Sequence, residues 1–144
     1  MADYKNAEQY PDPTAYAALK KIEREEQTGF FRPLVYICSP YAGDVVTNTK
    51  NARKYSRFAV DKGCIPVASH LLYPQFLDDN NPEERELALL FGRVLLDKCR
   101  ELWVFGMVRS KGMAVEVERA LQKGKTIRYF TKDCEEVEVL YAED

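Results

Sequence analysis

The most informative part of this chain is ELWVFGMVRSKGMAVEVERALQKGKTIRYF, residues 101–130, which reads as two strands joined by a helix. Residues 101–106 are a short, mostly apolar run of the length expected for a buried parallel strand, and residues 125–130 are predicted to form the next strand. Between them, a helix is predicted over 112–123 that ends before Gly124 and carries one apolar stripe: Met113, Val117, Ala120 and Leu121. A strand, a helix and a strand in this order predict parallel strands with a helix packed on their sheet.

The same alternation continues on the N-terminal side of this stretch. PLVYICS (33–39) and CIPVAS (64–69) are predicted strands. The helix expected between them, over 47–62 with Gly63 just past its end, has three residues on one side: Ala52, Tyr55 and Ala59. Asn81 and Pro82 are predicted to begin a further helix that ends near Lys98 and buries Leu87, Leu90, Phe91, Val94 and Leu95. HLLYPQFLDDN, before it, is expected to be a long loop, and such loops often serve a binding site.

The predicted order of strands and helices defines the class of fold. We expect an α/β fold, a flavodoxin- or Rossmann-like three-layer sandwich, with a parallel sheet of four or five strands and helices on both faces. VEVLYAED is expected to add an edge strand or to form a tail. Residues 1–29 are expected to form a helical arm, with Asp12 capping a helix over about 13–27, and residues 30–144 to form the domain. Ligands in such folds bind beyond the carboxyl ends of the strands, which here are the loops 39–47, 69–81 and 106–112.

Length, charge and composition limit the classes of function. The chain has 144 residues, enough for one domain with a core, and its net charge of −2 does not predict a nucleic acid polymer as partner. No apolar run approaches the ~20 residues of a membrane span, and the N-terminus lacks the features of a signal peptide, so we expect a cytoplasmic protein without a membrane partner. One histidine and four cysteines without a C-x-x-C pair predict reduced, mostly buried thiols, and neither a metal site nor a cofactor.

The helix predicted over 112–123 contains two glutamates, Glu116 and Glu118, with different expected surroundings. Glu116 lies at the edge of the apolar stripe, one turn from two of its members, whereas Glu118 lies well away from it. A partly desolvated carboxylate near the start of a helix that follows a strand is a candidate nucleophile or acid. The alternative is a surface glutamate paired with Arg119 or Lys123.

The turn before this helix, which contains Ser110 and Gly112, has the features of an anion site. A serine hydroxyl, free backbone N–H groups and the helix dipole together suit an anion such as phosphate. Ser110 could instead simply cap the helix. FGMVRSKG matches neither G-x-G-x-x-G nor a Walker sequence, so the turn is not one of the common phosphate-binding loops.

Two further loops carry polar side chains to the same expected edge. Ser39, Tyr41 and Asp44 follow the first strand, and there a tyrosine could cover a sugar or a base while a serine donates a hydrogen bond to it. The alternative is an ordinary turn around Pro40. The single histidine, His70, begins the long loop, where it is either a ligand contact or a structural hydrogen-bonding residue.

Three segments of the sequence resemble those of a known superfamily. VYICSPYAG (35–43), CRELWVFG (99–106) and SKGMAVEVERALQKGK (110–125) are similar to nucleoside 2-deoxyribosyltransferase-like proteins, closest to small phage and bacterial members described as domains of unknown function. The signature of the superfamily is serine or aspartate, x, glycine, three residues and glutamate, with alanine four residues on and G-K at the end of the helix. The resemblance covers roughly residues 33–130.

The resemblance implies an enzyme that acts on an N-glycosidic bond through a glutamate nucleophile, which falls on Glu116. Members acting on free nucleosides tend to carry aspartate six residues before that glutamate. Members that hydrolyse nucleoside monophosphates, such as 2′-deoxynucleoside 5′-phosphate N-hydrolases, tend to carry serine there, as this chain does at Ser110. A 5′-monophosphate held by Ser110, Gly112 and the helix N-terminus is therefore expected. The residues that match the turn around the sugar and phosphate are Tyr36, Ser39, Tyr41 and Gly43.

The chain departs from the family pattern at the expected general acid. Phosphate-type hydrolases place an aspartate, which protonates the leaving base, eight residues before another aspartate that opens the third strand, and the matching residues here are Gly92 and Arg100. The acid must then come from elsewhere, and the candidates are Asp97, Glu86, Asp78, Asp79 and His70. Family members also form dimers in which one subunit helps to close the other's site, so we expect a homodimer or a higher homo-oligomer.

Three functions remain open from the sequence. The leading one is hydrolysis or transfer at the N-glycosidic bond of a small nucleoside or nucleotide ligand. The second is a non-catalytic nucleotide-binding module that keeps the anion-binding turn and has lost the acid. The third is an interaction protein in which residues 1–29 and the aromatic segment LLYPQF bind a partner.

Overall fold

The computed structural model describes residues 13–28 and 31–138, and the chain divides into two compact units, Met1–Arg32 and Pro33–Asp144. The first unit contains helix α1, Pro13–Thr28, which confirms the helix predicted over 13–27. Arg32 forms a two-pronged salt bridge with Glu25, with nitrogen–oxygen distances of 2.6 and 2.8 Å. The predicted N-cap Asp12 lies outside the described residues, and the division into 1–29 and 30–144 stays a prediction.

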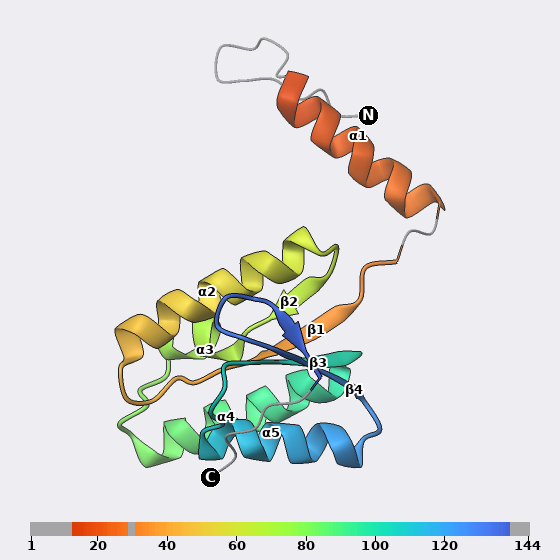
Figure 1. Ribbon diagram of the computed structural model, residues 1–144. Helices are drawn as coiled ribbons and strands as arrows, with labels where there is room; N and C mark the ends of the chain where they lie inside the picture. Colours follow the sequence, from red (N-terminus) through yellow and green to blue (C-terminus); the bar gives the residue numbers. More distant parts are fainter. Residues whose placement is uncertain (1–12, 29–30, 139–144) are drawn as a thin grey trace. The chain divides into compact units, whose positions relative to one another are not determined.

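The second unit is a sheet covered by helices on both faces (Figure 1). Its elements, in chain order, are β1 (Leu34–Cys38), α2 (Val45–Asp61), β2 (Ile65–Val67), α3 (Ser69–Leu72), the 3₁₀ turn η1 (Tyr73–Gln75), α4 (Pro82–Lys98), β3 (Glu101–Phe105), α5 (Lys111–Gln122), β4 (Thr126–Phe130) and β5 (Glu136–Val137). The strand order is β2-β1-β3-β4-β5, and the first four strands are parallel. The predicted α/β three-layer fold is therefore confirmed.

The fifth strand differs from the other four in direction. β5 pairs with β4 in the antiparallel sense, through Tyr129 with Val137 and Phe130 with Glu136. Arg128 and Glu136 connect the two strands by a salt bridge, with Arg128 Nη2 2.6 Å from Glu136 Oε1. The expected edge strand in VEVLYAED is thus present as a two-residue strand that begins one residue earlier, and the residues after 138 lie outside the described part.

Side chains alternate along β1 and β3 between the two helical layers, as the two-residue period of a strand requires. One buried cluster faces α4 and α5, and its strand members are Tyr36, Cys38, Leu102 and Val104. The other faces α2, and its strand members are Val35, Ile37, Trp103, Phe105 and Phe130. The buried residues of α2 are the predicted Ala52, Tyr55 and Ala59. Gly63 follows that helix with a φ of +81°, which an L-residue adopts with strain, so its predicted place at the helix end is confirmed.

The segment 69–81 is not the long loop that the sequence predicts. It folds into two short helical pieces, α3 and η1, before an irregular stretch that leads to α4. The helical turns give the backbone groups internal partners, for example Leu71 N–H to the carbonyl of Ala68. Tyr73 then packs its ring on Phe91 of α4, with ring centroids 5.3 Å apart. Side-chain contacts with α4 thus hold a segment that has no helical periodicity of its own.

Helix α4 begins as predicted but buries a different face. Asn81 caps it by accepting hydrogen bonds from the N–H groups of Glu83 and Glu84, at 3.0 and 3.3 Å. Its fully buried residues are Gly92 and Leu96. The predicted burial of five apolar residues is wrong for three of them, because Leu87, Leu90 and Val94 are exposed by 41, 46 and 45%; Phe91 and Leu95 are half-buried.

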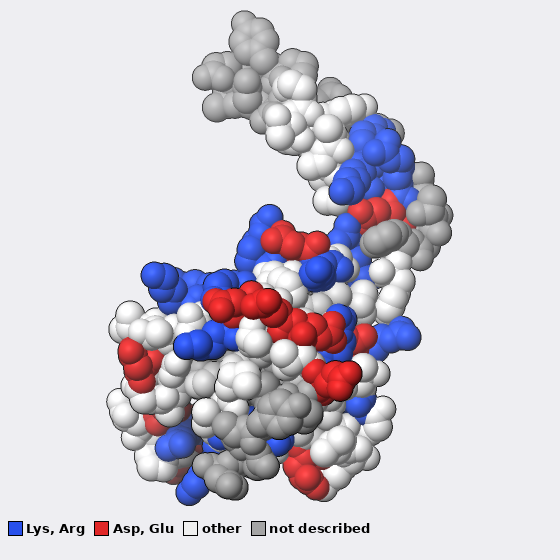
Figure 2. Space-filling model, in the orientation of Figure 1, with Lys and Arg blue, Asp and Glu red and all other residues white. Residues whose placement is uncertain are grey.

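The four cysteines are free thiols; Cys38 and Cys99 are buried, and Cys64 and Cys134 are partly exposed. On the face of the second unit viewed in Figure 2, acidic and basic side chains are interspersed. None of the helices within residues 13–28 and 31–138 combines the length and the hydropathy that crossing a bilayer requires.

Candidate functional site

The candidate site lies where β1 and β3 end side by side. The chain leaves β1 toward α2 on one face of the sheet and leaves β3 toward α5 on the other, so the two loops diverge (Figure 1). Such a switch point between neighbouring parallel strands is where open α/β sheets bind ligands. The loops 39–44 and 106–110 border it, and the residues expected to serve a ligand are distributed around it.

Glu116 lies in the second turn of α5, facing β1. Burial raises its pKa to about 7, although hydrogen bonds with the Tyr36 hydroxyl and the Cys38 thiol favour the charged carboxylate. Its side chain is half-buried, whereas Glu118 is exposed and accepts a long hydrogen bond from Gln122. The predicted contrast between the two glutamates is therefore confirmed in their burial, while the catalytic role of Glu116 stays a prediction.

The surface pairing considered for Glu116 is not formed with Arg119. That guanidinium instead binds Asp97, with nitrogen–oxygen distances of 2.6 and 2.8 Å. Glu116 thus belongs to a cluster of weakly acidic hydroxyl and thiol groups. A carboxylate in such a cluster has few charged neighbours, which explains why desolvation dominates its pKa.

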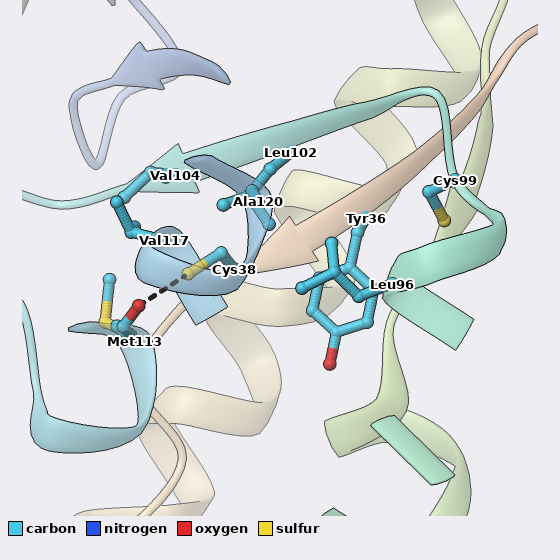
Figure 3. Close-up of a cluster of buried hydrophobic side chains, with 9 residues drawn as sticks. All are labelled: Tyr36, Cys38, Leu96, Cys99, Leu102, Val104, Met113, Val117 and Ala120. Carbon is cyan, nitrogen blue, oxygen red and sulfur yellow. Dashed lines mark hydrogen bonds between the residues drawn. The ribbon is translucent and has the colours of Figure 1, made fainter. Parts of the chain in front are cut away.

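Tyr36 is the central residue of this cluster. Its hydroxyl is 2.7 Å from the Ser69 hydroxyl oxygen, and the two residues are buried. In Figure 3, the Tyr36 ring extends from β1 among buried apolar side chains such as Leu96. Burial and the Glu116 charge raise the pKa of Tyr36 well above its ordinary value, so its hydroxyl stays protonated and can donate. This hydroxyl pair thus connects β1 and the first residue of α3 to Glu116.

Gly92 of α4 packs directly against this hydroxyl pair. A Cβ at position 92 would lie 3.2 Å from the Tyr36 hydroxyl oxygen and 3.6 Å from the Ser69 Oγ. The position that matches the family's aspartate therefore faces the site, but Tyr36 and Ser69 occupy the adjacent space. A larger side chain at position 92 would require the tyrosine to move.

Cys38 contributes a thiol on the same side of β1 as Tyr36. Its sulfur is 3.9 Å from the carbonyl oxygen of Met113, the contact drawn in Figure 3, and Glu116 is its other hydrogen-bond partner. A thiol has one hydrogen, so it donates to one of these oxygens at a time. Burial, with the neighbouring Glu116 charge, raises the pKa of Cys38 well above its usual value, and this thiol is therefore not a nucleophile at neutral pH.

The turn before α5 carries the expected anion-binding features. The Ser110 hydroxyl oxygen accepts a hydrogen bond from the Met113 N–H at 3.2 Å, so Ser110 does cap the helix. Its own O–H remains available to donate to a ligand. Gly112 is exposed in the first turn, and a Cβ there would meet the Ser110 hydroxyl at 4.0 Å. Arg109 lies close enough to Cys38 for its charge to lower that pKa.

The loop after β1 contains Ser39, Tyr41 and Gly43. Ser39 is 2% exposed, and its hydroxyl oxygen has no hydrogen-bond partner in the described part of the chain. Gly43 has a φ of +94° and permits the sharp turn into α2. The Asp44 carboxylate caps α2 by accepting a hydrogen bond from the Thr47 N–H at 3.2 Å, and a contact with a ligand stays a prediction. Asn48 of that helix secures the loop through the Tyr41 and Ala42 carbonyls.

His70 of α3 contacts Tyr41 of the loop that follows β1. Their rings stack with centroids 5.0 Å apart and an angle of 24° between the planes. Burial lowers the pKa of His70, and the negative charge of Asp79 partly opposes this. Burial raises the pKa of Tyr41, and Asp79 raises it further. The charge of Asp79 therefore acts on both groups, although Asp79 lies 38 positions after Tyr41 in the sequence.

The remaining acid candidates are differently placed. Asp97 is bound to Arg119 near the end of α4, and Asp78 accepts a hydrogen bond from the Asn80 N–H at 2.9 Å. Glu86 is exposed. Arg100 lies just before β3, where its N–H binds the Leu34 carbonyl, at the amino ends of the strands and thus opposite the site. In the part of the chain that is described, no group of three or more histidine, cysteine or acidic residues could hold a metal ion.

Three residues at the site were not predicted from the sequence: Cys38, Ser69 and Arg109. Cys38 lies two residues after Tyr36 on β1, which places both side chains on one face of the sheet. The two-residue period of the strand could therefore have predicted Cys38 as a site residue. Arg109 directly precedes the predicted N-cap Ser110, so its place beside the anion site could also have been predicted from the sequence. Ser69 had no such signal, because its contact with Tyr36 spans 33 residues.

Comparisons with known proteins agree with this architecture. Residues 33–130 match the protein family described as domain of unknown function DUF7768. No curated protein matches the sequence. Among solved structures, the 2-deoxyribosyltransferase of Bacillus psychrosaccharolyticus superposes with a TM-score of 0.57 at 15% identity, over 68% of this chain and 72% of that one. The 2-deoxyribosyltransferase of Leishmania mexicana gives 0.49 at 12% identity, over 78 and 83%. The chain therefore belongs to the DUF7768 family, and its fold is that of the nucleoside 2-deoxyribosyltransferases.

Proposed function

We propose that this protein cleaves the N-glycosidic bond of a nucleotide-like ligand, a nucleoside 5′-monophosphate, with Glu116 as the nucleophile. The observation that carries the proposal is the Glu116 carboxylate at the switch point, desolvated to a pKa of about 7 and contacted by Tyr36 and Cys38. Perturbed carboxylates in such positions are more often functional than surface ones. The shared fold with 2-deoxyribosyltransferases supports the same class of reaction.

In the first step, a Glu116 oxygen attacks the anomeric carbon and the bond to the base breaks. The glycosyl ester that forms is then resolved by water, which gives hydrolysis, or by a second base, which gives transfer. Tyr36 donates a hydrogen bond that orients the carboxylate toward the sugar. Because the nucleophile must be ionised, the active fraction of Glu116 increases as the pH rises toward and through about 7.

The phosphate is proposed to bind at the start of α5. The Ser110 O–H, the N–H groups of the first helical turn and the positive end of the helix dipole all favour an anion there. Arg109 adds a positive charge beside this turn. The buried Ser39 hydroxyl, at the end of β1, has a free donor for the sugar or phosphate. The remaining proposed binding residues come from the loop that follows β1 and from α3, and they are Tyr41, Gly43 and His70.

The test uses purified protein, a set of nucleosides and their 5′-monophosphates, and chromatography of the released base. Wild type is expected to release base from a monophosphate, and Glu116→Gln to lose that activity while keeping its fold. Glu118→Gln is the matched control, because it makes the same change two residues away on an exposed side chain. Equal turnover by Glu116→Gln and Glu118→Gln would remove Glu116 from the mechanism.

One observation favours a second function, a nucleotide-binding module without catalysis. Position 92 carries no acid, and a side chain there would crowd the Tyr36 hydroxyl. The anion-binding turn and the Ser39 hydroxyl would still hold a nucleotide. A monophosphate that raises the melting temperature with saturation, while no base appears over long incubation, would establish binding without catalysis.

We also propose that the chain forms a homodimer through α4. Leu87, Leu90 and Val94 repeat at helical spacing and are all more than 40% exposed, an apolar stripe of the kind found at subunit interfaces. Leu90→Lys is expected to shift the protein from dimer to monomer in analytical ultracentrifugation. Val115→Lys is the control, because Val115 is an exposed apolar residue on α5 outside the stripe. A monomeric wild type at micromolar concentration would contradict the proposal.

A further inference from the structure

Cleavage of an N-glycosidic bond leaves the electron pair of that bond on the base, so the base must be protonated or otherwise stabilised as it departs. Position 92 matches the general acid of the phosphate-type hydrolases that the sequence resembles. Here it is a glycine, and Tyr36 is packed against it. The Tyr36 hydroxyl is committed to Glu116 and Ser69. The proposed reaction therefore needs a proton donor that the family pattern does not assign.

Two of the four candidate carboxylates, Asp97 and Asp78, are engaged in structural contacts. Asp97 is neutralised by a two-pronged salt bridge with Arg119, which holds the pKa of Asp97 below its usual value. Asp78 organises the start of α4, where its own N–H donates to Glu84 at 2.7 Å and its carboxylate accepts from the Asn80 N–H. Both carboxylates therefore already have structural partners.

His70 differs from these carboxylates in two respects. It directly follows Ser69, which contacts Tyr36, and its ring stacks on Tyr41. Its preceding residue, Ser69, holds the Tyr36 hydroxyl at 2.7 Å, and Tyr36 in turn contacts Glu116. The His70 ring stacks on Tyr41 at 5.0 Å, in the loop that follows β1. The His70 ring is thus stacked on the loop that follows β1, and His70 directly follows the residue whose hydroxyl contacts Tyr36 in the cluster that contains the nucleophile.

We propose that the His70 imidazolium is the general acid that protonates the leaving base, held by its stack on Tyr41. This inference rests on the proposed function. It gives a shared role to three residues from three segments, which are Tyr41 from the β1–α2 loop, His70 from α3 and Asp79 from the segment before α4. Tyr41 orients the donor, and Asp79 favours its charged form.

The step balances in atoms and electrons. A Glu116 oxygen forms a bond to C1′ as the bond from C1′ to the base nitrogen breaks, and the electron pair stays on the base. An N–H of the imidazolium gives its proton to a ring nitrogen or carbonyl oxygen of the base, which leaves a neutral imidazole. In hydrolysis, that imidazole accepts a proton from water as the water oxygen attacks C1′, which regenerates the carboxylate and the imidazolium.

Other groups near His70 define its protonation. Burial lowers the His70 pKa, the charge of Asp79 opposes that effect, and Tyr41 faces the ring as a neutral phenol whose own pKa is raised. The Glu116 pKa of about 7 lies above the lowered His70 pKa, so His70 loses its proton before Glu116 does as the pH rises. The active form, with a charged carboxylate and a charged imidazole, is therefore the less populated of the two singly protonated forms. Turnover should then rise with pH up to the His70 pKa and fall above about 7.

The test compares two leaving groups on the full-length protein. One substrate is a purine 2′-deoxynucleoside 5′-monophosphate, and the other is 4-nitrophenyl 2-deoxyriboside 5-phosphate, whose nitrophenolate leaves without a proton. His70→Asn is expected to lower kcat on the nucleotide by roughly 10²–10⁴-fold and on the nitrophenyl substrate by less than about tenfold. Equal losses on both substrates would show a structural role, and no loss on the nucleotide would show that His70 is not the acid.

The pH profile and the neighbouring aspartates give independent readouts. In His70→Asn, the residual turnover should no longer fall above about 7 but rise and level off, as ionisation of Glu116 alone requires. Asp79→Asn should lower nucleotide turnover severalfold, and Asp78→Asn, the same change one residue away, should not. An unchanged profile in His70→Asn would overturn the assignment.

The two proposals fail in different ways. If Glu116→Gln hydrolyses the nitrophenyl substrate as fast as wild type, the nucleophile is wrong whatever His70 does. If wild type and not Glu116→Gln cleaves the nitrophenyl substrate, while wild type releases no base from any nucleotide, the nucleophile stands and the His70 proposal fails.

Discussion

Helices α4 and α5 cover the same face of the sheet, yet they use their apolar residues in different ways. α5 buries Met113, Val117 and Ala120, three of the four residues of its predicted stripe. α4 turns the stripe of Leu87, Leu90 and Val94 to solvent and contacts the sheet through Gly92 and Leu96. A helix at a binding site can thus be positioned by its smallest residue, and its larger apolar residues are then left for another surface.

This difference has a direct effect on the site. α5 brings a carboxylate to the carboxyl ends of the strands, and the buried stripe beside Glu116 desolvates it. α4 brings only the backbone of Gly92, which lets the Tyr36 hydroxyl lie between the two helices and meet Ser69. Substitutions on each helix can therefore separate their contributions to stability and to turnover.

The largest expected effect on stability concerns the buried contact of α4. Leu96→Ala should lower the free energy of unfolding by about 2–5 kcal/mol, because the Leu96 side chain is fully buried in the cluster shared with α5. Leu89→Ala, on the same helix, should change it by less than about 1 kcal/mol, because Leu89 is 42% exposed and lies outside the proposed dimer stripe. Denaturant unfolding measures both, and equal losses would mean that α4 is rotated from the described orientation.

The next effect concerns Glu116 on α5 and depends on pH. A carboxyl whose pKa is raised in the folded state binds its proton more tightly there than in the unfolded chain, so it costs stability as the pH rises from about 4.5 through about 7. Glu116→Gln should therefore be more stable than wild type at pH 8, by at most about 3 kcal/mol, and equally stable near pH 4.5. Glu118→Gln should show no such dependence. If wild type and Glu116→Gln had the same free energy of unfolding at pH 8, the desolvation of Glu116 would be contradicted.

The smallest expected effect on stability comes from Gly92→Ala. Alanine favours the helix by up to about 1 kcal/mol, but its Cβ would lie 3.2 Å from the Tyr36 hydroxyl oxygen, so the two effects nearly cancel. Turnover should nevertheless drop about tenfold, because the displaced hydroxyl no longer orients Glu116. In a Tyr36→Phe background, Gly92→Ala should have little further effect on turnover. A full additional loss there would show that Gly92 acts through another group.

The sequence was sufficient where the deciding contacts are local. The stripe on α5, the Asn81 cap of α4 and the positive-φ residue Gly63 follow from spacing within one or two turns, and the order of strands and helices follows from apolar periodicity. The burial of Glu116 relative to Glu118 belongs to the same group, because it depends only on helix geometry.

The remaining features depend on contacts between distant segments. α4 has apolar residues on several sides, so periodicity alone does not predict which side meets the sheet. The side that does carries Gly92, which lies against the Tyr36 hydroxyl. Segment 69–75 is helical and contacts α4 through the ring of Tyr73 on Phe91, a pair that lies 18 positions apart in the sequence. The stack of His70 on Tyr41 joins residues from separate loops, and no local pattern marks the pair.

The central claim is that Glu116 becomes covalently attached to the sugar. A 2-deoxy-2-fluoro nucleoside 5′-monophosphate should slow both steps, so that acid quenching followed by peptide mass spectrometry can detect the adduct. We expect wild type to gain the mass of one fluorinated sugar phosphate on the peptide that contains Glu116, and Glu116→Gln to gain none. Release of base by wild type without any adduct, or an adduct that persists in Glu116→Gln, would contradict the account.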